Sequence, residues 1–246
     1  MYIFYRLLLA HLLAEFPLQF DLIYRLKVSK KTGIWLHSFI FFAVAVLLLI
    51  PWWGVGRFWL FLDFLLLTHY VLDRLKIVLY RRYQVDNLGI FLLDQVAHIG
   101  FIYLVFFIEL DEKLRYKLPT ALNMFTVVYQ DNQIILILIG YLFATFGVSF
   151  FVYYLEKLFF VSRTEKGFLT TAEKYYTIFG GLLITTFAWM KGYYFLLIPL
   201  VPISQWYLFS LRKNEQDQGP TFFALITNAF VATGVGICLR YIPATV

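Results

Sequence analysis

Apolar residues form long stretches along the chain, and short polar segments that hold most of the charges separate them. A helix needs about 20 predominantly apolar residues to cross the roughly 30 Å hydrocarbon core of a bilayer. The first stretch contains His11 and Glu15 and is not followed by a small-x-small cleavage pattern, so we interpret it as a retained span and not as a signal peptide. The pattern predicts eight membrane-spanning helices, at about 2–20, 34–52, 58–80, 87–109, 134–155, 174–190, 192–211 and 221–240.

The composition agrees with a membrane protein. Of the 246 residues, 61% are hydrophobic and only 15% are charged, and the mean hydropathy is +0.75. Soluble domains contain about 45–50% apolar residues and about 25% charged ones. This excess of apolar residues excludes an ordinary soluble enzyme, a disordered chain and a nucleic-acid-binding module. We expect an all-α, polytopic transmembrane helix bundle whose main partner is the lipid bilayer.

The basic residues are distributed unevenly between the two sets of alternate loops. One set holds twelve Lys and Arg residues, and the other holds six. Cytoplasmic loops of membrane proteins carry the excess of basic residues. We therefore expect the richer set to face the cytoplasm and both termini to face outward. The same bias accounts for the net charge of +6, which therefore does not indicate a nucleic-acid partner.

The predicted spans divide the chain into three parts. Residues 1–109 are expected to form a four-helix membrane domain, and residues 134–246 a second group of membrane helices. Between them, residues 110–133 include apolar side chains spaced on one helical face, so we expect this segment to lie flat on the outer surface of the membrane. Thr170 and Glu173 have the spacing of a capping box ahead of the sixth span.

The first four spans contain all four histidines of the chain. An ionised side chain at the middle of a membrane helix costs about 2.5–3.5 kcal/mol, so several ionisable groups in one region require partners or a function. Three of the histidines have a carboxylate four residues away, which places both groups on one face of a helix. The pairs are His11 with Glu15, His69 with Asp73, and His98 with Asp94, and His37 is the fourth histidine.

The predicted topology places these groups at matching depth. In the first and third spans the carboxylate lies on the cytoplasmic side of the histidine, and in the oppositely directed fourth span the reversed order gives the same result. We therefore expect the three pairs to point into one cavity that opens toward the cytoplasm, with His37 at its rim. Gln19 and Lys76 extend the faces of the first two pairs, and Gln95 is next to Asp94.

Histidine and carboxylate groups without cysteine favour a divalent metal, with zinc preferred and manganese or iron also compatible. A catalytic site uses three protein ligands and keeps a position open for water. We expect Glu15 to be the general base and Lys76 to hold a phosphate or carbonyl oxygen of a lipid-like substrate. His11, His69 and His98 with Asp73 or Asp94 are the preferred ligands, and a division between two metals stays open. The candidate metal ligands are His11, His37, His69, Asp73, Asp94 and His98.

These residues favour a metal-dependent hydrolase that acts at the cytoplasmic leaflet, and two other functions stay open. Chains of His and acidic groups also form proton or metal-ion pathways, which makes a transporter the first alternative. Against it, the polar residues stop at mid-membrane, and no pair of helices broken by Gly or Pro occurs in corresponding halves of the chain. The second alternative is a non-enzymatic scaffold or sensor in which the polar network only stabilises the bundle.

Four blocks, taken in order, resemble a family of bacterial inner-membrane proteins catalogued as domain of unknown function 3307. The blocks are 8–19, His37, 69–76 and 93–98. The resemblance covers about residues 1–105 and implies a multi-pass protein of the bacterial inner (plasma) membrane, but the family has no settled activity. It carries aspartate more often at the position of Glu15. A second similarity, to membrane-bound metal-dependent hydrolases, rests only on the spacing of His69 and Asp73.

Overall fold

The computed structural model of the chain describes residues 1–84, 86–110, 113, 130–160, 170–190, 192–212 and 221–242. Within these residues the secondary structure is helical and contains no β-strand, as the hydropathy pattern predicts. The fold divides into two compact units, Met1–Ile135 and Leu136–Ala244. Most of the predicted surface segment at 110–133 lies outside the described residues.

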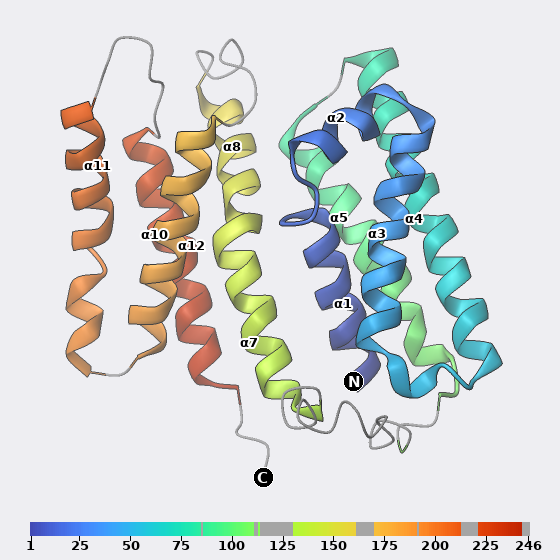
Figure 1. Cartoon of the computed structure of the whole chain (residues 1–246). Coiled ribbons are helices and arrows are strands. Elements are labelled where there is room, and N and C mark those ends of the chain that lie inside the picture. Colours follow the sequence, from blue (N-terminus) through green and yellow to red (C-terminus); the bar gives the residue numbers. More distant parts are fainter. Residues whose placement is uncertain are drawn as a thin grey trace. The chain divides into compact units, whose positions relative to one another are not determined.

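The first unit is a helical bundle closed at one end by a short helix. Its helices are α1 (Tyr2–Glu15), α2 (Asp21–Ser29), α3 (Lys31–Leu48), α4 (Gly56–Tyr83) and α5 (Leu88–Tyr103). α1, α3, α4 and α5 alternate in direction, and α2 lies at the end where α1 stops and α3 starts (Figure 1). α1 contacts α3 and α5, and α4 contacts the same two helices, so the four long helices form a closed ring.

The first predicted span is shorter than expected. The apolar pattern predicts one span over 2–20, but α1 ends at Glu15 and a separate helix begins at Asp21. Pro17 explains the break, because a proline disfavours the helical conformation of the residue before it. Phe16 accordingly has φ −112° and ψ −80°, outside the helical region. The predicted span was wrong for residues 16–20, and the break lets the chain fold back as α2.

Gly33 allows α2 to pack directly on α3. A Cβ atom at this position would collide with the backbone of Leu26 and Lys27, so only a glycine permits this close approach. α2 buries Ile23 and Lys27, which are four residues apart and therefore lie on one face of the helix. As a result, a lysine that the hydropathy pattern assigns to a loop enters the bundle.

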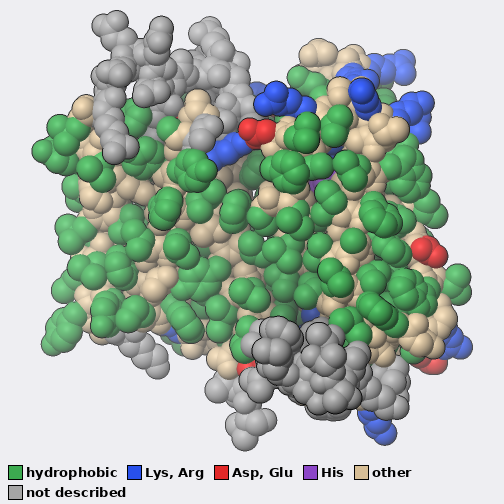
Figure 2. Space-filling model, viewed as in Figure 1, with side chains coloured by type: hydrophobic (Ala, Val, Ile, Leu, Met, Phe, Trp, Pro, Cys, Tyr) green, Lys and Arg blue, Asp and Glu red, His purple; other side chains and the backbone are tan. Residues whose placement is uncertain are grey.

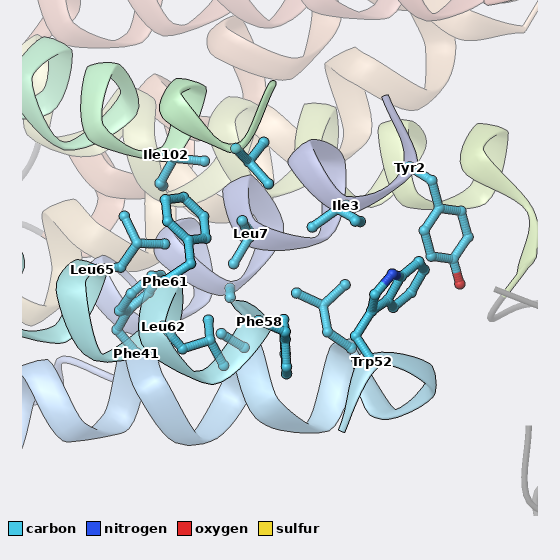
Figure 3. Close-up of a cluster of buried hydrophobic side chains, with 14 of the residues drawn as sticks. Tyr2, Ile3, Leu7, Phe41, Trp52, Phe58, Phe61, Leu62, Leu65 and Ile102 are labelled. Carbon is cyan, nitrogen blue, oxygen red and sulfur yellow. The ribbon is translucent and has the colours of Figure 1, made fainter. Parts of the chain in front are cut away.

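A tightly packed apolar core fills the part of the bundle away from α2. Figure 3 shows its side chains converging from all four long helices, including Tyr2, Leu7, Phe41, Leu62 and Ile102. Each of these five is at most 2% exposed. Because lipid tails are as apolar as these side chains, close packing and not transfer from water holds such helices together. This core fixes the positions of the helices that carry the polar residues described below.

Five helical segments among the described residues are long and apolar enough to cross a membrane. In Figure 2, hydrophobic side chains cover most of the visible surface of the first unit, and many Lys and Arg side chains gather at the end that carries α2. The chain is an all-α membrane protein, as its hydropathy predicts. The number of eight spans and the outward orientation of the termini stay predictions. The five segments are Lys31–Leu48, Leu88–Phe107, Asn132–Phe159, Gly192–Leu211 and Phe222–Arg240.

The second unit is also helical. A π-helical turn, Phe143–Gly147, connects its first two helices. Small residues allow α10 (Thr171–Trp189) to pack closely on α12 (Phe222–Arg240). A Cβ atom at Gly236 would lie only 2.6 Å from the Thr185 carbonyl oxygen. The predicted capping box of Thr170 and Glu173 is confirmed at the start of α10. The helices are α7 (Asn132–Leu142, which begins in the first unit), α8 (Val148–Phe159), α10 (Thr171–Trp189), α11 (Leu200–Arg212) and α12 (Phe222–Arg240).

Candidate metal centre

The residues of the three predicted His–carboxylate pairs and His37 lie together inside the first unit, on the side of the apolar core that faces α2. None of the seven is more than 8% exposed. Buried charges require partners, because an unpaired charge inside a protein costs several kcal/mol. The cluster consists of His11 and Glu15 from α1, His37 from α3, His69 and Asp73 from α4, and Asp94 and His98 from α5.

Glu15, His37, His69 and Asp73 form one half of the cluster, which we call the tetrad. His37 Nε2 lies 2.9 Å from Glu15 Oε2 and 3.6 Å from Asp73 Oδ2, and His69 Nε2 lies 3.6 Å from the same Asp73 oxygen. One ligand atom from each residue lies within 4.8 Å of the others. Metal–ligand bonds of about 2.0–2.1 Å in a tetrahedral site place the ligand atoms about 3.4 Å apart. Three spacings in the tetrad are close to this value, and the others are at most 4.8 Å, so the four groups could hold a metal ion.

The imidazole rings form a continuous row through the cluster. The ring centroids of His37 and His69 are 5.1 Å apart, those of His69 and His98 are 4.4 Å apart, and those of His98 and His11 are 5.0 Å apart. Phe41 stacks on His69 from the side of the apolar core, with 5.1 Å between ring centroids. The row connects the tetrad to the second half of the cluster.

Lys76, Asp94 and Gln95 form the polar edge of this second half. Lys76 Nζ lies 2.6 Å from Asp94 Oδ2, and Gln95 Nε2 donates a hydrogen bond of 3.2 Å to the same oxygen. Gln95 Oε1 lies 3.4 Å from His11 Nε2. Ligand atoms of Asp73, Asp94 and His98 also lie within 4.8 Å of one another. Asp73 therefore belongs to both groups of candidate ligands.

His98 is held in one orientation by its own helix. Its Nδ1 donates a hydrogen bond of 2.8 Å to the backbone carbonyl of Asp94, which leaves the lone pair on Nε2. Histidine ligands of metals are commonly oriented by this type of hydrogen bond. The Nε2 atoms of His98 and His69 have no hydrogen-bond partner among the described residues. Both side chains line a small cavity that Phe41 and Leu65 also border.

Lys27 belongs to the site although the hydropathy pattern places it in a loop. Its Nζ atom lies 2.8 Å from Asp73 Oδ1 and 3.7 Å from Glu15 Oε2, and it donates a hydrogen bond of 3.0 Å to Gln19 Oε1. The signal that could have revealed it is the four-residue spacing of Ile23 and Lys27, which gives this short segment one inward face. The lysine supplies positive charge to two buried carboxylates.

The structure brings together the residues predicted from the sequence, but several of them lie in other positions than expected. His37 is completely buried within the tetrad and not at a rim. Gln19 follows the end of α1, so it does not extend the helical face of His11 and Glu15, and it contacts Lys27 instead. His11 touches the row of rings but lies outside both groups of candidate ligands.

These features define the class of protein: an all-helical membrane protein with a buried cluster of His and carboxylate groups that could hold a metal ion. A sequence model of the family described as "Protein of unknown function (DUF3307)" matches residues 3–126, which include α2–α5 and every residue of the site. The chain belongs to this family. No curated protein and no solved structure matches the chain.

Proposed function

We propose that the protein is a metal-dependent hydrolase of the bacterial inner membrane that acts on a lipid-like substrate at the cytoplasmic leaflet. The observation that carries this proposal is the tetrad, in which four buried groups that can bind a metal ion lie within 4.8 Å of one another. Zinc is the favoured metal because it prefers tetrahedral coordination by histidine and carboxylate groups.

His37, His69 and Asp73 are the metal ligands in this proposal, and Glu15 is the general base. Two histidines and one carboxylate match the three-ligand sets of zinc hydrolases, which leave a position for water. A zinc ion held by these residues would supply a water ligand whose pKa is lowered toward about 7. Glu15 lies beside His37 and can accept the proton of that water. Lys27 holds Asp73 through Oδ1, the oxygen that does not face the two imidazoles.

The charges of the site favour a single divalent cation. Three carboxylates and two lysines give a net charge of −1 when the imidazoles are neutral. One divalent cation changes this to +1, and a hydroxide then brings it to zero. A net charge costs free energy in a buried site that apolar residues surround. A second divalent cation would leave a large positive excess, so we favour one metal in the tetrad.

The surroundings of the cluster disfavour the two alternative functions. A transport pathway needs polar groups or water across the whole membrane, but the cluster ends against Leu7, Leu62 and Leu65, which are at most 2% exposed. A purely structural network satisfies all its members. The Nε2 atoms of His69 and His98 are not satisfied by any described residue, which favours a ligand-binding role.

Metal content tests the proposed site. We expect protein purified without added metal to contain about one zinc ion per chain. His69→Ala should lose this zinc, whereas Thr68→Ala should keep it, because within the described part of the chain the Thr68 hydroxyl bonds only to the backbone of its own helix. Elemental analysis of the wild type and both variants measures this. A chain that binds no metal, or a His69→Ala variant that retains it, would contradict the proposal.

Hydrolysis tests the proposed role of Glu15. We expect Glu15→Gln to retain zinc and to hydrolyse ester or phosphoester lipids about 10²–10⁴-fold more slowly, as is typical when a general base is removed. The measurement is turnover by zinc-loaded protein in nanodiscs. Ion flux through proteoliposomes without hydrolysis of any lipid would instead support the transporter.

A further inference from the structure

The two lysines of the site are placed differently. The Lys27 side chain is 6% exposed, and its ammonium faces three acceptors. The Lys76 side chain is 26% exposed, and among the described residues its ammonium hydrogen-bonds to the Asp94 carboxylate alone. Because an ammonium group carries three N–H donors, Lys76 retains donors for a further acceptor that reaches it from outside.

The surface around Lys76 is apolar. Leu75, beside it on α4, is 53% exposed, and Leu93, beside Asp94 on α5, is 67% exposed. Val96, one residue beyond Gln95, is also 67% exposed. On a membrane helix, exposed side chains of this kind face lipid. Lys76 is thus a cation of the site that a molecule can approach from the bilayer, between α4 and α5.

If α4 crosses the membrane, as the hydropathy pattern predicts for 58–80, its length places Lys76 close to the lipid head groups. Its 28 residues span about 42 Å, which exceeds the hydrocarbon core by about 12 Å. If both ends share this excess, the C-terminal end at Tyr83 projects by about 6 Å. Lys76 lies about 10 Å along the helix from Tyr83, so its Cα is about 4 Å inside the hydrocarbon boundary. A lysine stem is long enough to bring the ammonium to the head groups.

The net charge of the cluster determines whether it attracts an anionic ligand. With one divalent cation and a neutral water in the tetrad, the cluster carries +1 and attracts an anion, whereas the metal-free cluster carries −1 and repels one. Charge-assisted hydrogen bonds from lysine to phosphate are among the stronger ones in proteins. Metal and anion should therefore strengthen each other's binding, since such coupling is reciprocal.

We propose that the metal-loaded site binds the phosphate group of an anionic lipid that enters from the bilayer between α4 and α5, with Lys76 as the residue that contacts the phosphate. This inference rests on the proposed metal site and specifies its substrate class. The apolar tails of the lipid lie against the exposed side chains around Leu75 and Leu93. Lys27 has no part in this contact and acts on the Asp73 side of the cluster.

Lipid selectivity in nanodiscs tests the inference. The zinc-loaded full chain is placed in phosphatidylcholine that contains a small fraction of phosphatidic acid, and retained lipids are counted by native mass spectrometry. We expect about a tenfold preference for phosphatidic acid, the effect of one charge-assisted hydrogen bond. Lys76→Gln should abolish this preference, and Lys76→Arg should retain it. The matched control is Arg74→Gln, an exposed cation two residues away on α4, which should change nothing.

The outcomes separate the possible explanations. An undiminished preference in Lys76→Gln, or equal losses in Lys76→Gln and Arg74→Gln, would overturn the inference, as would a preference that persists after zinc is removed. If soluble glycerol 3-phosphate competed for the site as effectively as phosphatidic acid, the phosphate would not have to come from the bilayer. If Lys76→Gln does not fold, zinc removal and competition still test the wild type.

Zinc analysis of the same samples distinguishes the two proposals. Absence of zinc from every sample would refute the metal site itself. Zinc-containing protein without a lipid preference would refute the lipid inference alone.

Discussion

The two units of the chain bury polar side chains in different ways. In the second unit, neutral side chains donate hydrogen bonds to backbone carbonyls, as Thr185 does to Ala232 and Asn228 does to Thr177. In the first unit, charged and imidazole side chains contact one another, as Lys27 and His37 contact Asp73. Both sets are buried. In the first unit a nitrogen of each of the four imidazoles has no hydrogen-bond partner among the described residues, whereas of the second unit's two examples only the Asn228 side-chain oxygen has none.

This difference separates packing from function. A hydroxyl or amide that donates to a neighbouring backbone carbonyl stabilises a helix pair by about 0.6 kcal/mol in membranes. A group of mutually paired charges is costly to assemble and contributes little net stability. The first unit therefore carries an arrangement that packing alone does not require, whereas the polar groups of the second unit act as contacts between helices.

The largest contrast is expected from breaking one contact in each unit. Asp73→Ala should destabilise the metal-free protein by about 3–5 kcal/mol, because it leaves the buried Lys27 ammonium without its nearest carboxylate. Asn228→Ala should cost only about 0.6 kcal/mol, the typical value for a membrane hydrogen bond. Chemical unfolding in detergent micelles measures both free energies of unfolding.

A second substitution shows whether the unpaired charge is the cause. Lys27→Met added to Asp73→Ala should restore most of the stability, because it removes the ammonium, but it should not restore zinc binding. Equal effects of Asp73→Ala and Asn228→Ala would mean that the two units bury polar groups for the same reason.

A smaller effect is expected at the contact that holds α2 in place. Gly33→Ala should cost about 1–3 kcal/mol, because its Cβ atom collides with the backbone of α2. The displaced helix withdraws Lys27 from Asp73, so we also expect altered zinc affinity. Gly100→Ala on α5 is the control, since nothing lies within 4 Å of the added atom. Thermal unfolding and zinc titration report the two effects, and an unchanged Gly33→Ala variant would disprove the close packing.

The smallest effect is expected at the capping box of the second unit. Thr170→Ala removes the side-chain cap of α10 and should cost about 1 kcal/mol. Thr170→Ser keeps the hydroxyl and should recover most of this loss. Neither variant should change the zinc content, which elemental analysis measures. Loss of zinc in Thr170→Ala would show that the second unit contributes to the metal site.

The sequence predicts the membrane class and the members of the cluster well, because both depend on local patterns. The hydrophobic stretches reflect the thickness of the bilayer, and the four-residue spacing of His69 and Asp73 places them on one helix face wherever that helix packs. The distribution of Lys and Arg between the loops predicts the direction of each span, and the directions place the three His–carboxylate pairs at the same depth in the membrane. Each of these signals is readable without knowledge of the tertiary contacts.

The position of α2 and the role of Lys27 could not be predicted in this way. Pro17 indicates a break, but a break does not say where the following segment packs. That depends on Gly33, whose missing side chain admits the backbone of α2 and becomes informative only when the two helices are seen together. The burial of His37 follows from the same contact, since α2 covers the start of α3.

The shortness of α1 has a consequence for the end of the bundle. Its 14 residues span about 21 Å, some 9 Å less than the hydrocarbon core of a bilayer. No residue of α1 is exposed, so neighbouring helices and not lipid surround it, and the missing length is not a mismatch that the bilayer must relieve. α2 lies beyond Glu15 and places Lys27 there. A charged lysine of the protein, and not a lipid head group, therefore closes this end of the cluster.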